Sequence, residues 1–179
     1  VRTADGIAFL DIRAAAEHPE TWLAAFEAAI AGGFPVADDS LAMIQQNAAR
    51  YRAEDFYPTK SRRADLLRFL KPRPGLYEQL SEMHDVGLLG QLFPEFRAIS
   101  SRVVRDFYHK YTVDEHTLPT IRNLERLTGA PSERERFSRL LGELEEPELL
   151  VLALLYHDVG KWRDDDHHVQ RGRMAREMF

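Results

Sequence analysis

The sequence has no cysteine among its 179 residues. Without thiols, disulfide bonds, thiolate catalysis and zinc sites with sulfur ligands are excluded. A chain free of cysteine suits a reducing compartment, and we expect a cytoplasmic protein. Long apolar runs are also missing, since the longest, at residues 149–156, is far shorter than a bilayer span. We therefore expect no membrane partner.

Positive charge is scarce as well. Lysine and arginine total 24 against 29 aspartate and glutamate residues, which gives a formal charge of -5. With no long basic run, nucleic acid is not an expected partner. The first residues lack the apolar core of a signal peptide and the chain does not start with methionine. We expect it to be part of a longer polypeptide.

Apolar residues recur mainly at helical spacing, and no stretch longer than a few residues alternates like a strand. This pattern predicts an all-α fold. Pro19 opens an apolar stripe that should end at Gly32 and Gly33, the expected asymmetry of proline at a helix start and glycine past its end. Asp39 or Ser40 is predicted to cap a second helix, and Ser61 a third.

The segment KPRPG at residues 71–75 interrupts the helical pattern and is the best boundary candidate. Residues 1–70 then form a helical preface, and residues 71–179 form the main helical domain. Just after the boundary, Leu76, Leu80 and Met83 recur at helical spacing and predict a new helix.

Three further helices are expected in the main domain. One follows Thr112 and carries Pro119, and because an interior proline is costly, its start is expected nearer Glu115. A second follows residues 132–135, which have the form of a capping box. The third opens at Pro147 and is apolar nearly all round, so we expect it to be the central buried helix.

A His-Asp pair, His157 and Asp158, ends that apolar helix. Burying an imidazole beside a carboxylate is costly unless both are paired or bind a metal. This donor set suits a divalent ion such as Mn, Mg, Fe or Zn. The alternative is a histidine that interacts with the helix dipole beside a solvated aspartate. Another such pair, at residues 84 and 85, lacks the preceding apolar run and is expected at the surface.

Two further histidines extend the pattern. His116 stands at the start of the helix expected after Thr112, and His168 opens a last helix that is expected to run to the chain end. With HDVGK at residues 157–161, they resemble the HD superfamily of metal-dependent phosphohydrolases. The segments GLLGQLFPEF at residues 87–96 and FYHKYTVDEHTL at residues 107–118 are more specific. Both resemble the central region of bifunctional PII uridylyltransferase/uridylyl-removing enzymes, with the strongest likeness from about residue 65 to the end.

The resemblance implies an all-α HD-type domain and a role for each matching residue. His116, His157 and Asp158 correspond to metal ligands, while Lys161 would lie near the substrate phosphate and His168 would be a further ligand or a phosphate contact. The implied reaction is hydrolysis of UMP from a tyrosine of the signalling protein PII. Such a reaction needs a nucleophile at neutral pH and neutralised phosphoryl charge, both of which a divalent ion supplies. Whether Asp158 is a ligand, a base for water or both stays open.

The chain departs from the family pattern in two respects. A distal aspartate of the HD motif has no counterpart in the 179 residues, so the domain is expected to be C-terminally incomplete. The nucleotidyltransferase and ACT domains of the parent polypeptide are likewise not in this sequence and are expected as partners in the same chain. The isolated chain can therefore lack activity.

Two other functions stay open. An HD phosphohydrolase could act on a free nucleotide or a cyclic dinucleotide, which the general motif allows. A non-catalytic helical module could transmit signals or bind PII, and the missing aspartate favours this reading for the isolated chain.

Overall fold

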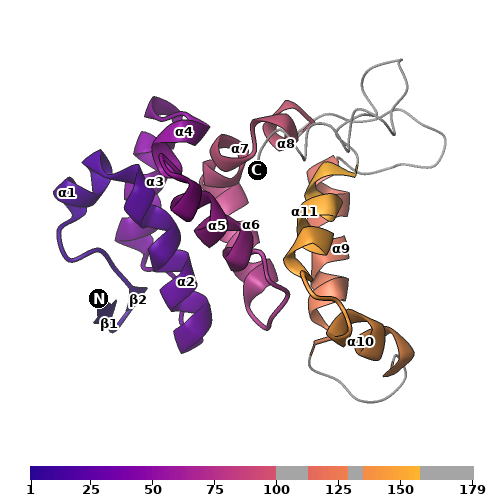
Figure 1. Ribbon diagram of the computed structural model, residues 1–179. Coiled ribbons are helices and arrows are strands. Elements are labelled where there is room, and N and C mark those ends of the chain that lie inside the picture. The colour runs from indigo at the N-terminus through magenta and orange to yellow at the C-terminus, as the bar shows by residue number, and fades with distance from the viewer. Residues whose placement is uncertain (100–112, 129–134, 158–179) are drawn as a thin grey trace. The chain divides into compact units, whose positions relative to one another are not determined.

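The computed structural model describes residues 1–99, 113–128 and 135–157 (Figure 1). Within these ranges the chain is built of α-helices, with two short 3-10 helices and one hairpin of two-residue strands. The prediction of an all-α fold is confirmed. The described residues group into two compact units, one of Val1–Phe69 and Glu78–Pro94, the other of Leu70–Tyr77 and the residues from Glu95 on. The domain boundary after residue 70 stays a prediction.

The first unit begins with the hairpin and continues as short helices. Its elements are β1 (Arg2–Thr3), β2 (Gly6–Ile7), α1 (Ile12–Glu17), η1 (Pro19–Thr21), α2 (Trp22–Gly32), α3 (Asp38–Asn47), η2 (Ala48–Arg50), α4 (Ala53–Phe56), α5 (Lys60–Phe69), most of α6 (Leu76–Asp85) and α7 (Leu88–Leu92). The strands β1 and β2 pair antiparallel, with Arg2 opposite Ile7.

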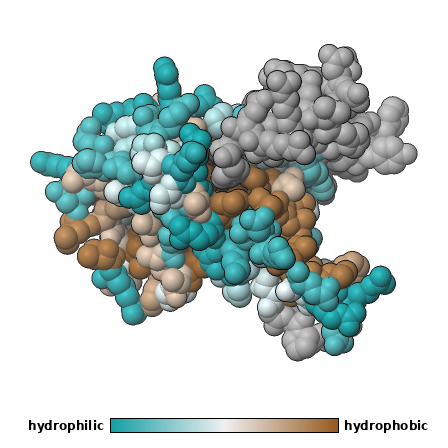
Figure 2. All heavy atoms as spheres, in the orientation of Figure 1, coloured by the Kyte–Doolittle hydropathy of each residue, from teal (hydrophilic) through white to brown (hydrophobic). Residues whose placement is uncertain are grey.

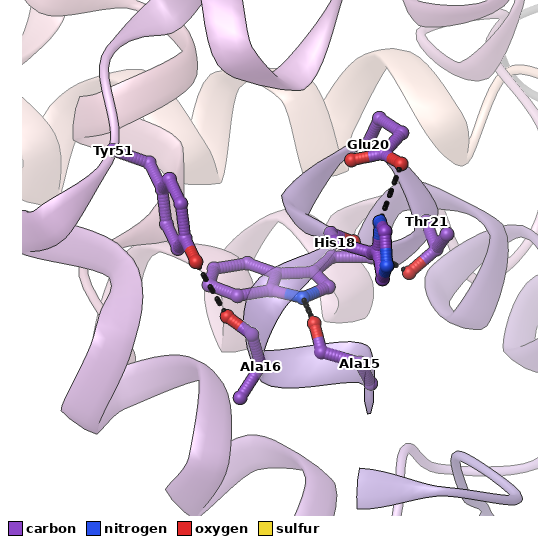
Figure 3. Close-up of polar contacts among 7 residues, drawn as sticks. Ala15, Ala16, His18, Glu20, Thr21 and Tyr51 are labelled. Carbon is purple, nitrogen blue, oxygen red and sulfur yellow. Dashed lines mark hydrogen bonds and ion pairs between the residues drawn. The ribbon is translucent and has the colours of Figure 1, made fainter. Parts of the chain in front are cut away.

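The first unit contains a cluster of aromatic side chains. The fully buried Trp22 makes edge contacts with Tyr51 and Phe56 at ring-centroid distances of 5.7 and 5.5 Å. Its Nε1–H donates to the Ala15 carbonyl at 2.7 Å, and the Tyr51 hydroxyl donates to the Ala16 carbonyl at 2.6 Å (Figure 3). The buried Trp22 and the half-buried Tyr51 thus both bind the end of α1, and the indole N–H is buried without loss of a hydrogen bond.

Helix ends in the first unit confirm some expectations and correct others. The stripe after Pro19 ends as predicted, because Gly33 adopts the left-handed conformation at φ 66°.

The cap predictions for the next two helices are wrong. Helix α3 begins at Asp38, ahead of both proposed caps, and Ser40 is buried, with its Oγ accepting from the Phe9 N–H. Helix α5 begins at Lys60, and the residue before it, Thr59, accepts the capping hydrogen bond instead of Ser61.

The second unit is built around two helices. Its elements are the first two residues of α6, α8 (Pro94–Ile99) from its second residue, α9 (Val113–Glu125), α10 (Glu135–Gly142) and α11 (Glu148–Tyr156). Helices α9 and α11 pack side by side (Figure 1). Ile121 of α9 and Val151 and Leu155 of α11 are fully buried, as the helical spacing of their apolar residues requires.

A carboxylate joins α9 to the start of α6. Glu125 accepts hydrogen bonds from the backbone N–H groups of Gly75 and Tyr77, at 3.1 and 2.7 Å. Arg122, one turn earlier, lies over the Tyr77 ring at 5.0 Å from its centroid. The first N–H groups of a helix have no partner within that helix, so Glu125 serves as a cap supplied by another helix.

Two expectations for the second unit are wrong. Helix α9 already includes Val113, and Pro119 lies inside it, so the helix does not start near Glu115. The Thr120 hydroxyl donates to the His116 carbonyl at 2.9 Å, which adds a hydrogen bond in the turn that contains the proline.

Helix α11 is not the central buried helix that its sequence predicted. It is buried on one side only, because Leu149 and Leu150 are 42% and 37% exposed. Figure 2 shows hydrophobic atoms on the molecular surface in this region. The last predicted helix lies outside the described residues.

No helix in the described ranges is both long and apolar enough to cross a membrane.

Candidate functional site

The structure brings two of the predicted site residues together. His116 lies in the first turn of α9, and His157 directly follows α11. Their ring centroids are 5.4 Å apart, with an angle of 57° between the ring planes. His116 is exposed and His157 is half-buried, so the pair lies at the edge of the helix packing. Asp158, Lys161 and His168 lie outside the described residues.

The packing of α9 against α11 explains this proximity. The buried face of α9 carries Leu118, Ile121 and Leu124, spaced at three residues, and it packs on the buried side of α11. Since the start of α9 meets the end of α11, the two helices run antiparallel (Figure 1). Each histidine is set by its position on a helix whose other residues supply the packing energy.

The orientation of the His157 ring is determined by its own helix. Its Nδ1 lies 2.6 Å from the Leu154 carbonyl oxygen. A carbonyl only accepts hydrogen bonds, so Nδ1 carries a proton and donates it to this oxygen. Metal-binding histidines commonly use one ring nitrogen for such an anchoring bond and the other as the ligand. The bond to Leu154 fixes the orientation of the His157 ring relative to the end of α11.

The spacing of the rings fits a shared cation. With metal–nitrogen distances of about 2.1 Å and a tetrahedral angle, two imidazoles on one ion have centroids roughly 5 Å apart. The separation between His116 and His157 is 5.4 Å, close to this value. Among residues 1–99, 113–128 and 135–157, no group of three or more metal-ligating side chains occurs. The described residues thus place two imidazole rings near each other, and a metal site at this position would need further ligands from beyond these ranges.

A carboxylate that sequence reasoning missed lies beside the end of α11. The hydroxyl of Tyr156 donates to Oε2 of Glu95 on α8 at 3.0 Å. Tyr156 is only 2% exposed and directly precedes His157. Glu95 belongs to the segment of residues 87–96 that carries the family resemblance, but nothing in that segment indicated its partner, which is 61 positions away.

An open apolar groove of about 510 Å³ lies next to the histidines. Thr120 and Leu154 line it, and these are the residues hydrogen-bonded to His116 and His157. The remaining lining residues are Asn123, Leu124, Leu127, Phe137 and Leu150. A larger pocket, of about 760 Å³, is lined by residues of α10 and its neighbours, and neither His116 nor His157 lines this pocket or the groove. The groove places open space one turn from the histidine pair.

No model of a protein family matches the chain. Curated proteins do. A bifunctional uridylyltransferase/uridylyl-removing enzyme of Pseudomonas putida strain F1 is 38% identical over 136 residues, which cover 74% of this chain and 15% of that protein. Enzymes of the same name from Thiobacillus denitrificans and Azotobacter vinelandii are 42% and 37% identical, over 63% and 74% of the chain.

The chain is homologous to a region of the bifunctional uridylyltransferase/uridylyl-removing enzyme. This confirms the resemblance drawn from residues 87–96 and 107–118. The chain spans about 15% of the length of the Pseudomonas putida relative and 13% of the Thiobacillus denitrificans one. The relatives' name describes two opposed activities, and which of them a site serves depends on its chemistry.

Proposed function

We propose that this chain carries the uridylyl-removing activity, a metal-dependent hydrolysis of the phosphodiester that links UMP to a tyrosine of PII. The observation that carries the proposal is the 5.4 Å separation between the rings of His116, in the first turn of α9, and His157, directly after α11. Two imidazoles at the spacing of a shared cation suit hydrolysis, and homology to an enzyme named as uridylyl-removing supplies the substrate class.

The residues divide into three roles. His116 and His157 would hold a divalent ion such as Mn, Mg, Fe or Zn, with Asp158 as the carboxylate ligand or as the base for the attacking water. When bound, the ion supplies an acidified water and charge neutralisation at the phosphoryl oxygens. Lys161 would add positive charge at the same oxygens, and His168 would contact the ion or the phosphate. The bond from His157 Nδ1 to the Leu154 carbonyl would orient the ring for coordination through its other nitrogen.

The substitution His157→Ala tests the site. We expect it to abolish Mn²⁺ binding in titration calorimetry and UMP release from uridylylated PII. Far-UV circular dichroism should stay unchanged, because loss of the one bond to Leu154 costs only about 1 kcal/mol. The matched control is His84→Ala, which removes the histidine of another His-Asp pair, on α6. If His157→Ala bound Mn²⁺ and released UMP as the unsubstituted chain does, the proposal would be wrong.

Substrate class is decided in the same assay. Uridylylated PII, free uridine nucleotides and a cyclic dinucleotide are compared at equal concentration with Mn²⁺ present. Preference for uridylylated PII supports the proposal, and preference for a small nucleotide indicates a general HD phosphohydrolase. A chain that binds no Mn²⁺ but binds PII would instead be a non-catalytic module.

A further inference from the structure

We infer that Glu95 and Tyr156 are positioning residues for His157, and that they act through the hydrogen bond between them. The inference rests on the proposed function for the nature of the ion bound at His157. It assigns a role to a carboxylate of α8 that lies 61 positions before its partner in the sequence.

The contact is well suited to hold the end of α11. The Tyr156 ring is buried at 2% exposure, and its hydroxyl donates to Glu95 Oε2 at 3.0 Å. A buried phenol hydroxyl without an acceptor is destabilising, so the bond favours one position of the ring. A carboxylate acceptor makes this bond stronger than one to a neutral group. The two side chains therefore tie α8 to the last residue of α11.

His157 depends on that same helix end. Its Nδ1 bonds to the Leu154 carbonyl, and its backbone N–H also points to this carbonyl, at 3.4 Å. The last carbonyls of a helix have no partner within the helix, and its final turn frays easily. Movement of Tyr156 would move Leu154 and turn the imidazole away from the direction set for Nε2. Fixing Tyr156 through Glu95 thus keeps His157 aligned with His116.

The experiment measures ion affinity and ring state in the 179-residue chain. Co²⁺ binding is followed by its visible absorption spectrum, and the tautomer of His157 is followed by ¹⁵N NMR of the imidazole. The variants are Glu95→Ala, Tyr156→Phe, the double variant and Glu95→Gln. The control is Tyr57→Phe, because Tyr57 is also buried, at 7% exposure, and donates its hydroxyl to the Leu92 carbonyl at 3.0 Å.

We expect Glu95→Ala and Tyr156→Phe each to weaken Co²⁺ binding by about 10- to 100-fold, the range for residues that orient metal ligands. The double variant should be no weaker than either single variant, because both remove the same bond. Glu95→Gln should recover most of the affinity, since its amide oxygen still accepts. Tyr57→Phe should lose similar stability but keep its Co²⁺ affinity. This combination would distinguish positioning from general destabilisation.

Two results would overturn the inference. One is Co²⁺ affinity in Glu95→Ala and Tyr156→Phe equal to that of Tyr57→Phe. The other is an unchanged Nδ1-protonated signal of His157 in both variants. If the unsubstituted chain bound no Co²⁺, the proposed metal site would be wrong, and the NMR signal would still decide whether Glu95 and Tyr156 orient the ring.

Discussion

The cap that Glu125 places on α6 leads to a quantitative prediction. Substitution of Glu125 by alanine removes the acceptor for two backbone N–H groups, those of Gly75 and Tyr77, at 3.1 and 2.7 Å. Hydrogen bonds to a charged group contribute about 1.5–3 kcal/mol each, and less where water competes. Glu125 is half-buried, so we expect Glu125→Ala to lower the free energy of unfolding by about 2–4 kcal/mol.

Glu125→Gln separates the charge from the geometry. The amide keeps one acceptor oxygen, so one of the two hydrogen bonds survives without charge, and the expected loss is about 1–2 kcal/mol. The matched control is Glu143→Ala, at the exposed residue directly after α10. Its contact with Arg139 spans 4.0 Å between exposed side chains, and its loss should cost less than about 0.5 kcal/mol.

Urea unfolding and amide hydrogen exchange measure these effects. The decrease in the urea midpoint of unfolding should be smallest for Glu143→Ala, larger for Glu125→Gln and largest for Glu125→Ala, with an unchanged slope of the free energy against urea concentration. Protection of the Gly75 and Tyr77 amides should fall in the Glu125 variants alone. If Glu125→Ala unfolded at the urea concentration of the unsubstituted chain and kept both amides protected, the reasoning from these two bonds would be refuted.

Two further predictions concern the first unit and the surface of α10. Burial raises the pKa of Glu82 above its ordinary value, and the nearby Asp85 and Asp38 raise it further against a lowering backbone hydrogen bond. Because the folded-state pKa is raised, the stability that protonated Glu82 contributes is fully present below the unfolded pKa and is lost as pH rises through the folded pKa. Glu82→Gln should therefore stabilise the chain at neutral pH and reduce the change in melting temperature between pH 7 and about pH 4. A variant that is less stable at pH 7 would contradict this. Gly33→Ala should lower the free energy of unfolding by about 1 kcal/mol, because the φ of Gly33 is 66°. Gly142→Ala, at the end of α10 with open space around it, should leave the stability unchanged or raise it. Equal melting temperatures of the two variants would contradict this difference.

Local features of the fold were predictable because they depend on neighbours in sequence. The stripe of α2 and its end at Gly33 follow from helical periodicity and from the one residue type that tolerates a left-handed backbone. Capping was less predictable. Ser40 is buried and accepts a hydrogen bond from the Phe9 N–H, which lies 31 positions away, so rules based on neighbouring residues do not predict this contact.

The candidate site divides in the same way. His116 and His157 were identifiable from a motif and from their positions at the ends of apolar helices. Glu95 was not, because an acidic residue in the first turn of a helix is usually explained by the helix dipole alone. Its role became apparent from its bond to the buried Tyr156 hydroxyl, which the sequence does not indicate.

The sequence by itself determined the helical class, the apolar stripes and the two histidines of the candidate site, because each depends on residue type and on spacing within one helix. The tertiary structure alone decided that these two rings lie 5.4 Å apart and that Glu95 of α8 bonds to Tyr156, the residue before one of them. The physical reason is that packing energy is nearly non-directional: apolar stripes indicate which faces are buried, but the partner, the register and the antiparallel direction of α9 and α11 follow from how all side chains of the unit fill one core.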